Sequence, residues 1–339
     1  MADAAFSWIA QPEVAAICRR ESRAQIMAEY ANAVARRYNV DAHYVTPTLG
    51  GTQAILHSLF ALVGVGDHVV VERPTYEPLY RVPELLGAEV SRLERKPKEQ
   101  WAVLPERLAQ LLTPRTRAVI LTNLHNPTGL AIPTDTLAQV GDMAARVGAA
   151  LLVDEVNLDF CFGQEAPLPT QPACLAVDNG VSWSSVSKCF GFSALRAGWI
   201  VTRHDEVAAA MRSATPYLHL ELPMTPFHLA TQVLSHADEL RDRASRVADN
   251  GRRIVNRWLE AERRVSWISP PAGLTGIVQL PPLMSDRKFS GHLRERYDTQ
   301  VVPGSLFEAS GTVRLSYGLP EPELEQALAN FSGALDELI

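Results

Sequence analysis

Lys188 and its neighbours form the part of the sequence best suited to covalent chemistry. Ser185 and Ser187 lie just before this lysine, and Arg196 comes eight residues after it. A lysine amine forms a Schiff base with a carbonyl group, and hydroxyl and guanidinium groups bind phosphate. The segment therefore suits a cofactor that carries both a carbonyl and a phosphate group. Taken alone, the same residues are more often a surface lysine in a serine-rich turn.

Two glycines before an expected helix offer a further place for a phosphate. Gly50, Gly51 and Thr52 precede a helical stretch over 53–62. The free backbone N–H groups at a helix N-terminus attract anions, and glycine lets a ligand approach the backbone closely. The alternative is an ordinary turn into a helix, which glycine pairs also mark.

Two polar residues follow apolar strands. Asn126 lies in an Asn-Pro-Thr-Gly segment beyond a strand that ends near Leu121, and Asp154 ends a strand over 150–153. Open α/β sheets bind ligands at the carboxyl edge of their strands, and a carboxylate on an apolar strand needs a partner. The alternatives are a turn asparagine and an aspartate that caps a helix.

Five apolar runs are expected to be the strands that position these side chains. They are Val69–Val71, Ala118–Leu121, Ala150–Val153, Val181–Trp183 and Trp199–Val201. Helical periodicity lies between most of them, as over 104–112 and 137–147. Strands that are apolar at nearly every position are typical of a mainly parallel sheet covered on both faces. An α/β domain is therefore predicted.

The pattern changes after residue 201. Apolar residues at helical spacing predict one long amphipathic helix over 240–258, followed by strands over 275–280 and 312–316 and a closing helix over 320–338. We expect an N-terminal arm over 1–35 that packs with the small domain, a large domain over 36–240, and a small α+β domain over 241–339.

Charge and composition exclude several classes of protein. With 32 Lys and Arg against 38 Asp and Glu, the 339 residues carry a net charge of −6, which argues against a nucleic-acid partner. No apolar run reaches the roughly 18 residues of a membrane span, and the first residues lack a secretory pattern. The four cysteines show neither disulfide nor metal-ligand spacing. We expect a cytoplasmic protein without a metal site.

Six segments, in order along the chain, resemble the class I/II aminotransferases, which are fold-type I enzymes of pyridoxal 5′-phosphate (PLP). A single such motif is weak, but six in order are specific, and the resemblance covers about residues 25 to 335. The segments are Thr48–Ile55, Arg73–Tyr76, His125–Gly129, Val153–Glu155, Ser185–Gly198 and Val313–Ser316.

The resemblance implies how PLP would be attached. Lys188 would hold it as a Schiff base. The groups that would bind its phosphate come from the glycine segment and from the lysine segment, and they are Gly51, Thr52, Ser185, Ser187 and Arg196.

The resemblance also assigns roles around the cofactor ring and the substrate. Tyr76 would stack on the pyridine ring, and Asn126 would hydrogen-bond its phenolic oxygen. Asp154 would pair with the pyridine nitrogen and keep it protonated, which makes the ring an electron sink. Arg314 would bind a substrate α-carboxylate through two parallel hydrogen bonds, unless it is a surface arginine on an edge strand.

Some positions depart from the family pattern. Three residues after Asp154 the family usually has a tyrosine that donates to the phenolic oxygen, whereas this chain has Asn157, which donates from a shorter side chain. The glycine usual two residues before Arg196 is Ala194. The N-terminal segment shows no counterpart of the family's pocket-lining glycine segment or of the tyrosine that reaches the phosphate across the dimer. These departures bear on substrate and reaction type more than on cofactor binding.

The resemblance implies a homodimeric PLP-dependent aminotransferase that moves an amino group from an amino acid to a 2-oxo acid. In that reaction Lys188 also moves the Cα proton. The alternatives are another PLP reaction, by a lyase, cyclase or decarboxylase, which Asn157 would suit, and a non-enzymatic PLP-fold binding module. Such a module would more naturally lack Lys188 or Asp154, and both are present.

Overall fold

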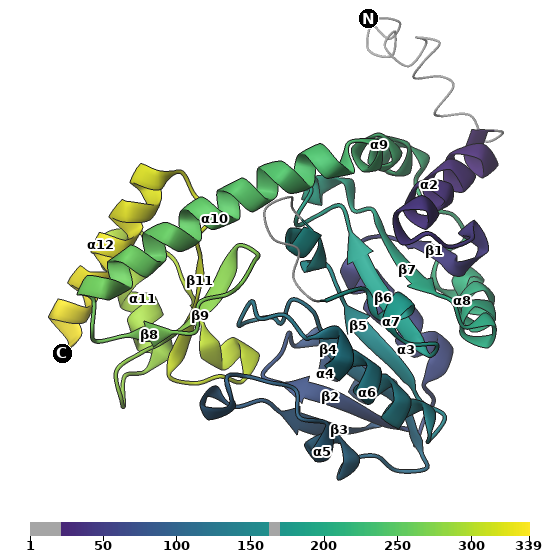
Figure 1. Ribbon diagram of the computed structural model, residues 1–339, viewed down its shortest axis with the longest axis horizontal. Coiled ribbons are helices and arrows are strands. Elements are labelled where there is room, and N and C mark those ends of the chain that lie inside the picture. Colours follow the sequence, from purple (N-terminus) through teal and green to yellow (C-terminus); the bar gives the residue numbers. More distant parts are fainter. Residues whose placement is uncertain (1–21, 163–169) are drawn as a thin grey trace, which may run out of the picture.

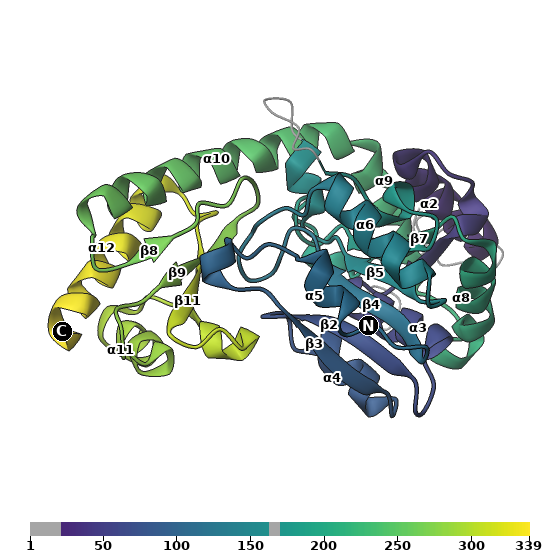
Figure 2. The ribbon, with the colours of Figure 1, turned by 60° about the horizontal axis from the view of Figure 1, so that its bottom comes forward.

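The computed structural model describes residues 22–162 and 170–339. They form two domains, joined by the long helix α10 (Ala237–Ala261), which runs along one side of both (Figure 1, Figure 2). The helix was expected from the periodicity over 240–258, and it buries Ala248, Ile254 and Val255. The predicted boundary between 240 and 241 therefore falls inside one continuous helix.

The large domain is built on a seven-stranded sheet with the order β1-β7-β6-β5-β4-β2-β3. Neighbouring strands are parallel from β3 across to β6. On the other side of the sheet, β7 pairs antiparallel with β6, and the edge strand β1 pairs antiparallel with β7. The expected α/β fold with a mainly parallel sheet is confirmed. The strands are β1 (Val45–Thr48), β2 (His68–Arg73), β3 (Glu89–Glu94), β4 (Thr116–Thr122), β5 (Ala150–Asp154), β6 (Gly180–Ser185) and β7 (Gly198–Thr202).

Helices cover both faces of this sheet. Side chains along a strand alternate between the two faces of the sheet, so successive residues pack in separate hydrophobic cores. In β2, Val69 and Val71 pack with helices α3, α4 and α8, whereas Val70 packs with α5, α6 and α7. The helices of the large domain are α3 (Gly51–Leu62), α4 (Pro78–Leu85), α5 (Pro105–Ala109), α6 (Thr134–Ala145), α7 (Ala173–Ala176), α8 (Asp205–Leu218) and α9 (Met224–Ser235).

The described part of the N-terminal arm lies on the large domain. Helix α2 (Arg23–Tyr38) packs against α9 and the end of the sheet, with Tyr30 buried against Phe227. The Tyr30 hydroxyl donates to the Gly198 carbonyl over 3.0 Å, and the Trp199 indole donates to the Tyr38 hydroxyl over 2.9 Å. For these residues, the expectation that the arm packs with the small domain is wrong, because their aromatic side chains pack against β7 and α9 of the large domain.

The small domain has a four-stranded antiparallel sheet with the order β10-β11-β9-β8. Its core joins the sheet to the three helices through residues such as Val278, Phe289 and Phe331. The elements are β8 (Ser266–Trp267), β9 (Thr275–Gln279), α11 (Asp286–Tyr297), β10 (Val302–Pro303), β11 (Thr312–Ser316) and α12 (Glu321–Leu338), with α10 as the third helix. Among the described helices, none is both long and apolar enough to span a membrane.

Candidate active site

Side chains from both domains line a cavity of about 570 Å³. The eleven residues predicted from the sequence all lie on its wall, although they come from segments spread over most of the chain. They are Gly51, Thr52, Tyr76, Asn126, Asp154, Asn157, Ser185, Ser187, Lys188, Arg196 and Arg314.

The parallel strands explain why distant residues meet here. Asp154 is the last residue of β5 and Ser185 the last of β6, and the carboxyl ends of parallel strands lie at the same edge of a sheet. Thr122, the last residue of β4, pairs with Asp154, so Asn126 follows at the same edge. Beyond β6 the buried Val186, Cys189 and Phe190 anchor the turn that carries Lys188.

The start of α3 forms one end of the cavity. Gly50 has φ 83°, and a Cβ on it would lie 2.6 Å from Arg196 Nη2, so glycine lets the arginine lie against this turn. The N–H groups of the first turn of α3, with the Arg196 guanidinium and the hydroxyls of Ser185 and Ser187, would bind a phosphate dianion.

Asp154 is a carboxylate with an unusual environment. Desolvation raises its pKa from 3.8 to about 6, while the Val156 N–H, which donates over 3.1 Å, and the nearby charge of Lys188 lower it. A bound cation would remove most of this penalty, because an opposite charge favours the ionised form. The protonated ring nitrogen of PLP would supply that cation, so the side chain fits the cofactor.

Arg314 of β11 and Asn126 meet across the cavity. Arg314 Nη1 donates to Asn126 Oδ1 over 2.8 Å, and its guanidinium lies 4.6 Å from the centre of the Phe307 ring. Burial lowers the pKa of Arg314, yet a guanidinium stays charged at neutral pH. Because the amide oxygen faces the arginine, the Asn126 amide nitrogen is left to donate to a ligand.

Sequence reasoning missed the apolar part of the wall. Ile55, Phe160, Leu274 and Phe307 line the cavity beside the polar residues. Phe307 is held against the large domain, since its carbonyl accepts the Thr75 N–H over 3.1 Å. No local pattern marks Leu274 or Phe307, because their place depends on how the two domains meet.

Several known proteins are similar to this chain in sequence and in structure. Over 86% of its length the chain is 30% identical to the capreomycidine synthase of Streptomyces vinaceus, of which it covers 75%. A PLP-dependent aminotransferase from Streptococcus suis 89-1591 superposes with a TM-score of 0.86 at 29% identity, covering 92% of this chain and 82% of that one. The PLP-dependent cyclase OrfR superposes with a TM-score of 0.81 at 30% identity, covering 92% of this chain and 83% of the OrfR chain.

The fold, together with a lysine, an aspartate and a helix N-terminus around one cavity, is that of the fold-type I PLP enzymes. Residues 18–331 match the family model described as aminotransferase class I and II, and the chain belongs to this family. Relatives named as aminotransferases match at 24 to 26% identity. The predicted PLP cofactor and the predicted aminotransferase class are confirmed.

Proposed function

We propose that the cavity transfers an amino group from an amino acid to a 2-oxo acid, with Lys188 as the residue that binds PLP. The observation that carries this proposal is the convergence of all eleven predicted residues on one cavity wall. PLP supplies an electron sink that stabilises negative charge at the substrate Cα.

The side chains of this chain take the remaining tasks. Arg314 binds the α-carboxylate of the amino acid through its planar guanidinium. Lys188 Nζ takes the Cα proton and returns it during the transfer. When PLP is bound, Asp154 would pair with the ring nitrogen, Tyr76 would stack on the ring, and Asn126 and Asn157 would donate to the phenolic oxygen. Its phosphate would be held by Gly51, Thr52, Ser185, Ser187 and Arg196, which line the same cavity.

A panel of amino acids tests the reaction type. The holoenzyme is mixed with each amino acid in the absence of a 2-oxo acid. We expect one equivalent of a 2-oxo acid per site and a stable change of the cofactor spectrum to its amino form, which added 2-oxo acid reverses. Continuous turnover of the amino acid without that change would contradict the proposal.

A PLP-dependent cyclase is the second candidate. The two relatives at 30% identity, a capreomycidine synthase and the cyclase OrfR, favour it, and Asn157 stands where the family usually has a tyrosine. A cyclase would turn over a single amino acid and release a cyclic product without forming a 2-oxo acid. The same panel therefore separates the two candidates.

We also propose a homodimer. Leu56 and Phe60 on α3 are 39% and 43% exposed. Tyr217 near the end of α8 is 81% exposed, and Leu220, two residues after that helix, is 86% exposed. The rings of Phe60 and Tyr217 lie 6.5 Å apart, so α3 and the end of α8 present neighbouring exposed apolar side chains. Contiguous exposed apolar surface is typical of an interface between proteins.

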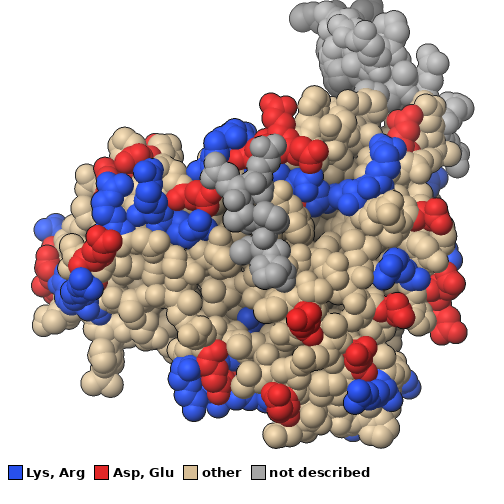
Figure 3. Space-filling model, in the orientation of Figure 1, with Lys and Arg blue, Asp and Glu red and all other residues tan. Residues whose placement is uncertain are grey.

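Location and other partners complete the proposal. Cys161, Cys174 and Cys189 are free and buried, which supports a cytoplasmic location, because reduced cysteines are typical of that compartment. On the face shown in Figure 3, acidic and basic side chains are intermixed, unlike the basic stripe of a nucleic-acid-binding protein. Among the described residues, no cluster of His, Cys, Asp or Glu is arranged to bind a metal ion.

A further inference from the structure

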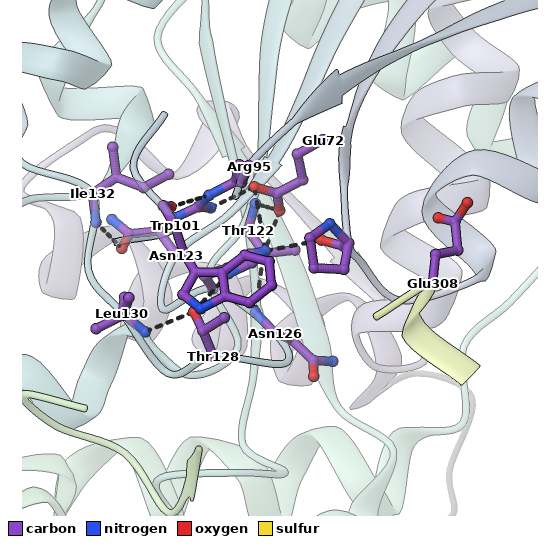
Figure 4. A network of polar contacts seen from close by, with 12 residues as sticks. Glu72, Arg95, Trp101, Thr122, Asn123, Asn126, Thr128, Leu130, Ile132 and Glu308 are labelled. Atoms are coloured by element: carbon purple, nitrogen blue, oxygen red, sulfur yellow. Dashed lines mark hydrogen bonds and ion pairs between the residues drawn. The ribbon is translucent and has the colours of Figure 1, made fainter. Parts of the chain in front are cut away.

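A fully buried carboxylate lies behind the cavity wall. Glu72 of β2 is 0% exposed and does not line the cavity. Its Oε1 accepts the backbone N–H of Thr122 over 2.6 Å and the Thr122 hydroxyl over 2.5 Å, and its Oε2 accepts Arg95 Nη1 over 2.6 Å (Figure 4). Arg95 is 3% exposed and also donates to the Trp101 carbonyl over 2.6 Å. The network thus spans the ends of the adjacent strands β3, β2 and β4.

The same network reaches the cavity through one hydroxyl. Thr122 gives its only hydroxyl proton to Glu72, so its oxygen is left to accept, and it accepts the Asn126 N–H over 3.1 Å. The Asn126 side chain in turn accepts from Arg314 over 2.8 Å. A continuous chain of hydrogen bonds therefore links the buried pair of Glu72 and Arg95 to the cavity.

Two other ionisable groups lie near Glu72: Asp154, whose pKa the Glu72 charge raises, and the buried His125. His125 Nε2 lies 3.8 Å from Glu72 Oε2, and it donates to the Pro74 carbonyl over 2.9 Å. His125 Nδ1 accepts from the Thr128 hydroxyl over 2.6 Å, and burial lowers the pKa of this histidine well below its usual value. Arg95 is therefore the counter-ion of Glu72.

We propose that Glu72, with Arg95 as its counter-ion, is a positioning residue for the reaction: through Thr122 it fixes the backbone of Asn126 and so aims the Asn126 amide at the cofactor. This inference rests on the proposed role of Asn126. A buried ion pair adds little to stability compared with an apolar core of the same shape. Its several directional bonds do fix the loop that carries Asn126.

The threonine offers a test that leaves the ion pair in place. Thr122→Val removes the hydroxyl, and Thr122→Ser keeps it. The measurement is the pH midpoint of the visible absorbance of the cofactor bound to the holoenzyme. Donation from Asn126 stabilises the deprotonated phenolic oxygen, so loss of its alignment should raise the midpoint. We expect a rise of about 0.5 to 1 pH unit for Thr122→Val and a midpoint near wild type for Thr122→Ser.

Two further variants identify the cause of a change. Thr122→Ala, which also removes the hydroxyl, should raise the midpoint in the same direction and serves if Thr122→Val does not fold. Thr202→Val removes another buried strand hydroxyl, which accepts the His204 N–H over 3.3 Å on β7, and should lower only the melting temperature.

The outcomes separate the two claims. If Asn126→Ala raises the midpoint and Thr122→Val and Thr122→Ala do not, Asn126 keeps its role and the positioning role of Glu72 is overturned. If Asn126→Ala leaves the midpoint unchanged, the proposed role of Asn126 fails as well. In the Asn126→Ala background, Thr122→Val should add no further rise, and an additive rise would contradict the inference.

Discussion

Asp154 and Glu72 lie at the carboxyl edge of the same sheet in different environments. Burial raises the pKa of Glu72 as well, but Arg95 and Thr122, which donate hydrogen bonds to it, offset part of that rise. Asp154 accepts one backbone N–H, from Val156, and desolvation raises its pKa to about 6. The carboxylate that lacks a strong internal partner is the one that faces the cavity, where a positively charged ring nitrogen can pair with it.

Replacement of Arg314 tests the substrate carboxylate site. Arg314→Ala should lower kcat/KM for amino acids by an amount that corresponds to about 2 to 5 kcal/mol, because a paired charged contact is lost. The spectrum of the bound cofactor should persist. Arg314→Lys keeps the charge but not the planar pair of donors, so its kcat/KM should lie between the values of wild type and Arg314→Ala. An Arg314→Ala enzyme with unchanged kcat/KM would refute the assignment.

Replacement of Asn157 tests whether this departure from the family pattern affects the bound cofactor. Asn157→Tyr places a phenol where the family usually has one, and its hydroxyl should stabilise the deprotonated phenolic oxygen of PLP. We therefore expect a lower pH midpoint for the visible absorbance of the bound cofactor, measured by spectral titration. If wild type, Asn157→Tyr and Asn157→Ala all titrate alike, Asn157 does not contact the cofactor.

At the scale of elements, helix α2 covers the end of the large sheet that is formed by β1 and β7. It joins the core cluster of Trp199 and Phe227, and the Tyr30 hydroxyl bonds to Gly198 of β7. Gly198 lies beside the turn at Gly50, which leads into the helix that we propose binds the phosphate. The N-terminal helix therefore supports the strand against which this turn packs.

Tyr30→Phe measures that support. Loss of the buried hydrogen bond over 3.0 Å should lower the free energy of unfolding by about 1 to 3 kcal/mol, because the Gly198 carbonyl loses its side-chain partner. Tyr44→Phe removes an exposed hydrogen bond to Asp205 and should change the free energy of unfolding by less than about 0.5 kcal/mol. Chemical denaturation of both variants provides the comparison, and equal effects would contradict this role of Tyr30.

Elements with a local signal were predictable, and those set by distant partners were not. The apolar runs predicted β2 and β4 to β7, whereas β3 was missed because it is an edge strand whose charged Glu89 and Arg92 pair with Arg115 and Glu308. The place of α2 depends on Trp199 and Phe227, far along the chain. Likewise, the polar motifs predicted the polar side chains of the cavity wall, but Phe307 joins that wall only through the contact between domains.

At the scale of the whole molecule, the cavity depends on both domains. The large domain supplies ten of the eleven predicted site residues that line the cavity, and β11 of the small domain supplies Arg314. Glu308, just after Phe307, pairs with Arg92 over 2.5 Å and with Arg73 over 3.2 Å, so charged contacts hold the two domains together beside the cavity.

The proposed homodimer gives a prediction at this scale. Phe60→Glu and Leu220→Glu place charges on the exposed apolar surface and should convert the protein from dimer to monomer, as measured by light scattering after gel filtration. Val65→Glu is the control, because Val65 is 88% exposed in the turn between α3 and β2. Variants that stay dimeric would show that this surface is not the interface.

Covalent trapping tests the assignment of Lys188 most directly. The sequence contains four lysines, Lys96, Lys98, Lys188 and Lys288, and of these Lys188 lines the cavity. Borohydride reduction of the yellow holoenzyme followed by peptide mapping should place one pyridoxyl group per chain on Lys188, and Lys188→Ala should abolish the label. A label on Lys96, Lys98 or Lys288, or no covalent label at all, would contradict the proposed active site.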